Sequence, residues 1–243
     1  DTMKKTLLTI CLVWMCFSLS AQKIIDLSGK WSFSIDRQDN GEKEKWFSHT
    51  LNDFINLPGS MPEKLKGDEV TAKTQWTGSL YDSSYYYNPY MEKYRKEGNI
   101  KFPFFLTPDK HYVGAAWYQK EVNIPADWKG ERILLFLERP HIETTVWVNG
   151  QKTGMQNSLC VPHQYDITRY VRPGKCTITI RVDNRIKEIN VGPDSHSITD
   201  QTQGNWNGIV GRICLQTTPK TYFDDIQIYP EPEQKLARVK VVI

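Results

Sequence analysis

The sequence lacks the features by which several classes of protein are recognised. Its 31 Lys and Arg residues nearly balance its 28 Asp and Glu residues, whereas nucleic-acid binding first requires a clustered basic face. The five histidines show no metal-ligand spacing to one another or to a pair of cysteines. Serine nucleophile elbows and phosphate-binding loops are also missing. We therefore expect no nucleic-acid partner, no metal and no cofactor.

Long apolar runs are also scarce, and the one at the N-terminus is too short to anchor the chain in a membrane. Two lysines follow Met3, an apolar run extends over residues 6–17, and small residues lie near Ala21. Cys16 lacks the small preceding residue of a lipoprotein signal, which favours cleavage near Ala21 over a lipid anchor. We therefore predict a signal peptide over residues 1–21, a periplasmic or extracellular location and no membrane span.

Cysteine is rare in the remaining sequence, where only Cys160, Cys176 and Cys214 are left. An odd number permits at most one internal disulfide in an oxidising compartment, and the spacing does not show which residues would pair. Free cysteine is often buried as a small apolar side chain. We accordingly expect three buried cysteines.

What the sequence does contain is a series of short segments typical of β-strands. In residues 31–35, Trp31, Phe33 and Ile35 alternate with two serines, as in a half-buried strand. Asn149-Gly150 is the strongest short signal for a two-residue hairpin turn, because both of its positions need positive φ. Pro, Gly, Asn and Asp separate the segments, which are 31–35, 117–124, 132–137, 144–148, 176–182, 212–217 and 223–229. The series predicts an all-β jelly-roll sandwich.

Two regions depart from this pattern. Residues 76–117 are rich in aromatic side chains without a clean period of two, and we predict a long excursion with one short helix near 90–97 that folds over one end of the sandwich. Near the C-terminus, "YPEPEQK" predicts a hinge and "LARVKVVI" a new strand. A lone terminal strand has no sheet of its own. We therefore expect a fragment that ends just inside a further domain.

Three stretches together resemble a known family: "WYQKEVNIPADWKGERILLFLERPHIETTVWVNGQKTG", "YDITRYVRPGKCTITIRVDN" and "GNWNGIVGRICLQTTPKTYFDDIQIYP". The ordered series of "IPADW", the "VWVNGQKTG" hairpin, the "YDIT" turn, the "GI" strand and the exit strand resembles the N-terminal sugar-binding domain of glycoside hydrolase family 2. This family includes β-galactosidases, β-glucuronidases and β-mannosidases. The resemblance extends from about Leu27 to Pro230.

The resemblance implies a galactose-binding-like jelly roll over residues 22–230. In complete family members an immunoglobulin-like domain and a catalytic TIM barrel follow, so residues 231–243 are expected to be a linker and the first strand of the immunoglobulin-like domain. The family's acid/base glutamate lies in an Asn-Glu pair on the barrel, and this dipeptide does not occur here. We therefore assign no catalytic residue to this chain. Its expected partners are a terminal β-linked sugar and the further domains of the same parent chain.

Sugar contacts require aromatic faces for the C–H surfaces of a pyranose, and amides or carboxylates for its hydroxyls. Trp206, flanked by Asn205 and Asn207, supplies both kinds of group. In related β-galactosidases the corresponding loop reaches the active site, so the resemblance implies substrate binding here, with Asp200 and Asp109 as additional candidates. The alternatives are that Trp206 packs at a domain interface and that the two acids lie in solvated turns.

Three functional classes remain for this sequence. We favour the accessory, non-catalytic domain of a secreted exo-β-glycosidase, similar to a β-galactosidase or β-glucuronidase. The alternatives are a free-standing carbohydrate-binding module or lectin, and a scaffolding or adhesion sandwich without a sugar site; the fold alone does not distinguish among these classes. The segment "GIVGR" stands where many family members have Gly-Ile-Trp-Arg, which leaves the identity of the sugar open.

Overall fold

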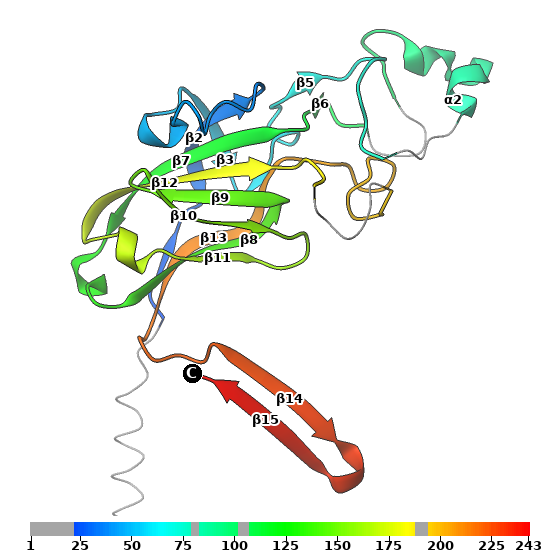
Figure 1. Ribbon diagram of the computed structural model, residues 1–243. Coiled ribbons are helices and arrows are strands. Elements are labelled where there is room, and N and C mark those ends of the chain that lie inside the picture. The colour runs from blue at the N-terminus through cyan, green and yellow to red at the C-terminus, as the bar shows by residue number, and fades with distance from the viewer. Residues whose placement is uncertain (1–21, 79–82, 102–106, 188–193) are drawn as a thin grey trace, which may run out of the picture.

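The computed structural model describes residues 22–78, 83–101, 107–187 and 194–243. The predicted signal peptide, residues 1–21, lies outside the described residues. Two antiparallel sheets pack face to face and form a sandwich (Figure 1). This confirms the predicted all-β class. In the part of the chain that the structure describes, no helix is both long enough and apolar enough to cross a membrane.

The first sheet has the order β1-β13-β8-β11, with β4 paired to β13. Its strands are β1 (Ile24–Asp26), β4 (Gly59–Ser60), β8 (Arg132–His141), β11 (His163–Asp166) and β13 (Gly208–Thr218). The register of β13 places Gly208 opposite His141, and it shifts between Val210 and Ile213. The start of β13 therefore lies beside the end of β8, although the two are far apart in sequence.

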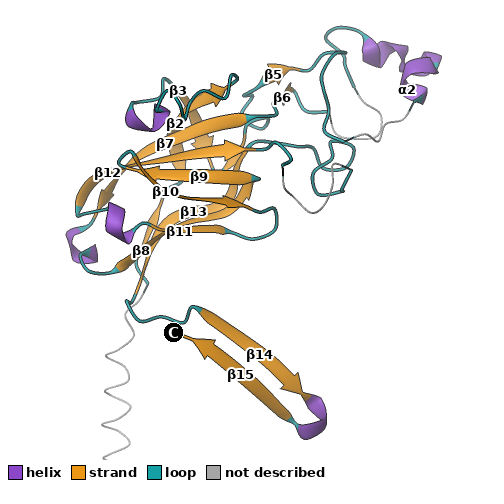
Figure 2. Ribbon diagram, viewed as in Figure 1, coloured by secondary structure: helices purple, strands orange, loops and turns teal. Residues whose placement is uncertain are grey.

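The second sheet has the order β10-β9-β12-β7-β2-β3 (Figure 2). Its strands are β2 (Gly29–Asp36), β3 (Asp53–Leu57), β7 (Ala115–Ile124), β9 (Glu143–Val148), β10 (Gln151–Asn157) and β12 (Gly174–Asp183). Asn149 and Gly150 join β9 to β10 with φ values of 50° and 76°, which confirms the predicted hairpin. The 3-10 turns η3 (Ala126–Trp128) and η4 (Thr168–Tyr170) follow β7 and β11.

The main core lies between the two sheets and is built from alternate residues of most of their strands. On β12, Ile178, Ile180 and Val182 are fully buried, as the pattern of 176–182 predicts. Trp31 and Phe33 fill the same layer from β2. Burying one side chain of this size contributes about 1.5–3 kcal/mol relative to leaving it exposed, so this layer stabilises the scaffold on which the loops are placed.

A second apolar cluster covers the outer face of the second sheet, the face that points away from the first sheet. Trp117 and Trp147 stack there with ring centroids 5.0 Å apart, and Leu51 packs against them. Trp46 and Phe47, from η1 (Trp46–Ser48), cover the pair from the segment that connects β2 to β3. This sheet is therefore buried on both faces over the first half of β7 and along β9.

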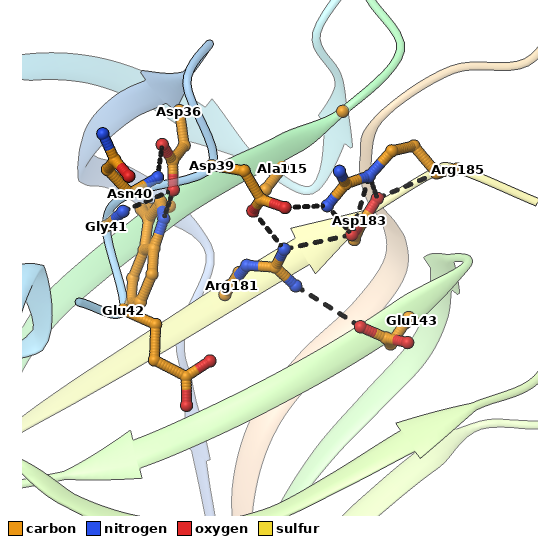
Figure 3. A network of polar contacts seen from close by, with 12 residues as sticks. Asp36, Asp39, Asn40, Gly41, Glu42, Ala115, Glu143, Arg181, Asp183 and Arg185 are labelled. Atoms are coloured by element: carbon orange, nitrogen blue, oxygen red, sulfur yellow. Dashed lines mark hydrogen bonds and ion pairs between the residues drawn. The ribbon is translucent and has the colours of Figure 1, made fainter. Parts of the chain in front are cut away.

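An ionic network lies beside this cluster at the end of β12 (Figure 3). The Arg181 guanidinium contacts Asp39 at 2.7 Å, Asp183 at 3.1 Å and Glu143 at 3.3 Å, and Arg185 contacts Asp183 at 2.6 Å. Although burial favours a neutral carboxyl, hydrogen bonds from Arg185 and the charge of Arg181 hold the pKa of Asp183 well below its usual range. The network fixes the end of β12, from which the chain continues toward the loop that precedes β13.

The aromatic excursion differs from its prediction in two respects. It contains a short α-helical turn, α2 (Ser84–Tyr87), and then a 3-10 helix, η2 (Pro89–Arg95), where one helix was expected. Pro89 divides them, because the residue before a proline is driven to extended backbone and Asn88 has a ψ of 120°. Residues 83–101, here named the tyrosine lobe, project beyond the sandwich instead of folding over its end (Figure 1). The pairing of β5 (Asp68–Glu69) with β6 (Lys110–His111) lies at the base of the excursion.

The C-terminal segment corrects a second expectation. The strand predicted at 223–229 does not join the sandwich: β14 (Asp225–Glu231) pairs with β15 (Leu236–Val242) as a separate hairpin closed by η5 (Pro232–Gln234). The terminal strand thus has a partner. Both strands alternate in polarity and are joined by a short turn, so pairing with each other needs little loop-closure entropy. The assignment of residues 231–243 to an immunoglobulin-like domain stays a prediction.

The cysteines are only partly as expected. Cys176 and Cys214 are buried, and burial raises the pKa of the Cys176 thiol to about 11. Cys160 is exposed, and all three are free. The prediction for Cys160 was wrong because this residue lies in the connection between β10 and β11, outside the alternating strands that fill the core.

Candidate functional site

The loop just before β13 combines one partly exposed aromatic ring with two buried amides. Trp206 is half-buried, whereas Asn205 and Asn207 on either side are 3% and 1% exposed. The two asparagine side chains therefore point into the protein and Trp206 points outward. The loop presents one ring at the surface and uses its neighbours as anchors.

Asn205 anchors the loop through bonds to three other segments of the chain. Its Nδ2 donates to Thr77 Oγ1 at 3.0 Å and to the carbonyl oxygen of Asn184 at 2.9 Å. Its Oδ1 lies 3.1 Å from His141 Nε2, and its backbone N–H donates to Asp200 Oδ1 at 2.7 Å. Because a buried amide without partners is costly, these bonds fix the position of the residue that precedes Trp206.

Asn207 supplies the anchor on the other side. Its Nδ2 donates to the carbonyl oxygens of Gly114 and Val182 at 2.9 and 3.0 Å, and its Oδ1 accepts from the Tyr118 hydroxyl at 2.7 Å. Burial raises the pKa of Tyr118 well above its usual value, so this hydroxyl remains a donor. The backbone carbonyl of Asn207 also accepts from the Met61 N–H at 2.7 Å.

Gly208 allows the loop to enter β13 at a close backbone crossing. Its φ is 146°, and a Cβ atom at this position would lie 2.5 Å from the carbonyl oxygen of Gly59. Such a distance excludes any side chain unless the backbone of β4 moves. The glycine after "NWN" is therefore required by geometry.

Trp206 rests on His141, the last residue of β8. The two rings are stacked, with centroids 4.5 Å apart and an interplanar angle of 20°. The bond from Asn205 Nδ2 to a backbone carbonyl fixes the orientation of that amide, so Asn205 Oδ1 accepts and His141 Nε2 carries the proton. Burial lowers the pKa of His141 to about 4, so a neutral imidazole supports the indole at neutral pH.

Trp206 and His141 line a pocket of about 460 Å³. The other lining residues are Glu138, Arg139, Leu159, Cys160, Pro162, Ser197 and Gln203. The pocket thus brings together an aromatic face, a cation, a carboxylate, an amide and a hydroxyl. This combination fits a small polar ligand with one apolar face, of which a pyranose is the common example.

A larger pocket of about 570 Å³ lies elsewhere, next to η3 and the segment that precedes β12. Its aromatic residue, Trp128, is buried and offers no free ring face. Neither Trp206 nor its anchoring residues line this pocket. The smaller pocket is therefore the better candidate for the predicted chemistry.

Four of the five predicted site residues lie close together in the loop before β13: Asp200, Asn205, Trp206 and Asn207. The carboxylate of Asp200 accepts a hydrogen bond from the Asn205 N–H. Asp200 is buried, accepts from the Thr77 N–H at 2.6 Å and lies 3.3 Å from His111 Nε2. Asp109 is exposed and comes two residues before His111. Of the five predicted residues, Trp206 alone lines the pocket. The buried side chains of Asn205, Asn207 and Asp200 hold the loop that carries Trp206 in place through hydrogen bonds.

Sequence reasoning missed the residues that complete the pocket, chiefly His141, Arg139 and Gln203. His141 comes four residues after the end of the predicted strand 132–137, near a strand end, where functional side chains often gather. The stacking of His141 and Trp206 was not visible in the sequence because it depends on the pairing of β8 with β13.

The fold is an antiparallel β-sandwich, and the rings of Trp206 and His141 line a pocket on it. The family model described as "Glycosyl hydrolases family 2, sugar binding domain" matches residues 24–219. This chain therefore belongs to glycosyl hydrolase family 2, with the match in its sugar-binding domain.

Curated relatives include β-glucuronidases from Paenibacillus borealis, 27% identical over 222 residues, and Homo sapiens, 25% identical over 237 residues. These alignments cover 85% and 86% of this chain and 31% of each relative. Solved structures include a β-glucuronidase from an uncultured Clostridium species, with a TM-score of 0.61 and 21% identity, and one from Ruminococcus gnavus in complex with D-glucuronic acid, with a TM-score of 0.61 and 17% identity. Each covers 92% of this chain and 34% of the solved chain. The chain thus spans about a third of the length of these relatives.

Proposed function

We propose that this chain is the N-terminal, non-catalytic sugar-binding domain of a secreted family 2 exo-β-glycosidase, of the β-glucuronidase or β-galactosidase type. The observation that carries the proposal is the outward placement of Trp206 over a pocket, with both flanking asparagines turned inward as anchors. A residue that served only for packing would not need two neighbouring amides to hold its ring at the surface.

The polar groups around Trp206 suit the hydroxyls of a sugar. Arg139, Gln203 and Ser197 line the pocket, and their side chains make no hydrogen bond or ion pair with other residues of the described ranges. They are available to a ligand, while the indole offers a flat face for the C–H surface of a pyranose. The site would then position the terminal sugar without performing chemistry.

The remainder of the proposal concerns the parent protein. The β-glucuronidases among the relatives are about three times as long as this chain, which supports further domains after residue 243, including a catalytic TIM barrel. Their names also support a β-linked uronide as the substrate. The lysines and apolar run of residues 3–17 support export to the periplasm or the extracellular space.

Substitution of Trp206 in the complete parent protein tests the proposed role. Trp206→Ala should lower kcat/KM on an aryl β-glucuronide or β-galactoside by about one to two orders of magnitude, or ~1.4 to 3 kcal/mol of transition-state binding. Trp206→Phe should retain most of the efficiency because it keeps an aromatic face. The melting temperature should change little for either variant.

Two results would contradict this assignment. Unchanged efficiency in the folded fraction of Trp206→Ala, together with a large fall in melting temperature, would make Trp206 a packing residue. Micromolar binding of a monosaccharide by residues 22–243 alone would favour a free-standing lectin, because a domain that contributes one loop to a shared site should bind more weakly than about 1 mM.

A further inference from the structure

The tyrosine lobe exposes an unusual amount of aromatic surface. Tyr87 and Tyr90 are 83% and 84% exposed, and Tyr86 is 51% exposed. Exposed apolar side chains are unremarkable singly, but grouped ones mark a surface that binds something. These three rings lie within five consecutive residues, so they form one group on the surface.

The lobe holds these rings on a bonded frame. Tyr85 is buried, and its hydroxyl donates to the carbonyl oxygen of Tyr94 at 2.8 Å. The Arg95 guanidinium donates to the carbonyl oxygen of Tyr85, and Asn88 Oδ1 accepts from the Tyr90 N–H at 3.0 Å. Aromatic rings on a fixed backbone lose little conformational entropy when they bind a ligand.

The base of the excursion is joined to the support of the Trp206 pocket. The carboxylate of Asp200 accepts from the Thr77 N–H and from the Asn205 N–H, and Trp76 contacts His111 edge-on with centroids 4.8 Å apart. The tyrosine lobe and the loop that ends at Trp206 lie on the same side of the sandwich (Figure 1). A glycan chain bound at Trp206 and extended along this side of the sandwich would reach the lobe.

The charge of the lobe narrows the class of ligand. Within residues 83–101 four cations, Lys93, Arg95, Lys96 and Lys101, stand against two acids, Glu92 and Glu97. The ion pair of Lys96 with Glu92 at 3.2 Å is exposed on both sides, so it holds these groups weakly. Aromatic faces suit pyranose rings, and the surplus cations suit carboxylates or sulfates.

We propose that the tyrosine lobe binds an internal segment of an acidic glycan chain whose terminal sugar occupies the Trp206 pocket. This inference rests on the proposed function in taking a carbohydrate as the ligand. The preferred substrate is then an acidic oligosaccharide, which contacts both the Trp206 pocket and the tyrosine lobe. A small aryl glycoside would fill the pocket without reaching Tyr87 and Tyr90.

Affinity electrophoresis of the complete protein tests this surface, with hyaluronan as the carboxylated probe, dextran sulfate as the sulfated probe and dextran as the neutral probe. Replacing both tyrosines, Tyr87→Ala with Tyr90→Ala, should weaken the affinity for an acidic polymer by at least about tenfold, or ~1.4 kcal/mol. The paired variant Tyr87→Phe with Tyr90→Phe should stay within about twofold of the unsubstituted protein, because the ring faces remain.

A matched control is Phe223→Ala, which removes an aromatic side chain that is 66% exposed outside the lobe. It should leave polymer affinity unchanged. Binding of hyaluronan but not of dextran sulfate would identify carboxylates as the recognised groups, and binding of both would identify anionic groups in general; either result supports the proposal.

Three outcomes would overturn it: equal affinity of the double alanine variant, equal retardation by neutral dextran, or self-association of the protein that depends on the tyrosines without polymer binding. The last result would assign the surface to a second copy of the chain. Trp206→Ala separates this inference from the proposed function. If polymer binding depends on the tyrosines but kcat/KM of Trp206→Ala is unchanged, the role proposed for the pocket is contradicted and that of the lobe is not. If kcat/KM of Trp206→Ala falls but polymer binding does not depend on the tyrosines, the role proposed for the lobe is contradicted and that of the pocket is not.

Discussion

Thr77 and Asp200 bond each other in both directions although 123 residues separate them in sequence. The Thr77 N–H donates to Asp200 Oδ2 at 2.6 Å, and the Asp200 N–H donates to the Thr77 carbonyl oxygen at 3.1 Å. The same carboxylate accepts from the backbone of Asn205 at 2.7 Å. One buried side chain therefore couples the base of the aromatic excursion to the loop that carries Trp206.

Asp200→Ala should destabilise the protein by about 2 to 4 kcal/mol, because it leaves the half-buried N–H of Thr77 and the buried N–H of Asn205 without an acceptor. Urea unfolding measures the loss, and Asp200→Asn should lose less because an amide oxygen remains. The control is Asp109→Ala at an exposed position, which should stay within about 0.5 kcal/mol. Equal effects of Asp200→Ala and Asp109→Ala would show that the carboxylate does not hold the loop.

Arg181→Met should cost about 3 kcal/mol of stability, because removing one partner of a buried ion network leaves Asp183 and Glu143 with less compensation. Lys175→Met on the same strand provides a matched control. Its partner Glu121 lies 2.8 Å away, but both side chains are largely exposed, so the change should be about 0 to 1 kcal/mol. A similar loss in the two variants would contradict the role assigned to burial.

Stability should fall as the pH is lowered from about 6.5 to about 4. Burial lowers the pKa values of His141 and His163 to about 4 in the folded state. The unfolded chain therefore takes up these protons first, and the stability that comes from the neutral rings is complete above 6.5 and lost toward 4. The loss should be on the order of 3 kcal/mol for each histidine.

Urea unfolding at several pH values measures this slope. Asp183, whose pKa lies well below its usual range, titrates beneath this window and does not cancel the effect. His163→Gln should reduce the slope, because it removes one of the two titrating rings. A flat profile for the unsubstituted protein between pH 6.5 and 4 would rule out two buried neutral histidines.

Most of the sandwich was predictable because strand formation here follows from local pattern. The alternation of Ile178, Ile180 and Val182 requires one buried face, and Asn149-Gly150 requires a tight hairpin. The location of Cys160 and the partner of β14 were not predictable, since both depend on which surfaces meet after folding. A strand of correct pattern can pair with a sheet or with its neighbour along the chain.

The features of the candidate site also fall into those that the sequence predicts and those that depend on the tertiary structure. The sequence by itself determined the strands, the hairpin, the family and the presence of an aromatic ring between two amides at residues 205–207. Only the tertiary structure decided that Asn205 and Asn207 point inward, that Trp206 rests on His141 and that Asp109 stays apart from the others. These relationships arise from strand pairing and from the need to satisfy buried polar groups, and a linear pattern does not contain the partners that satisfy them.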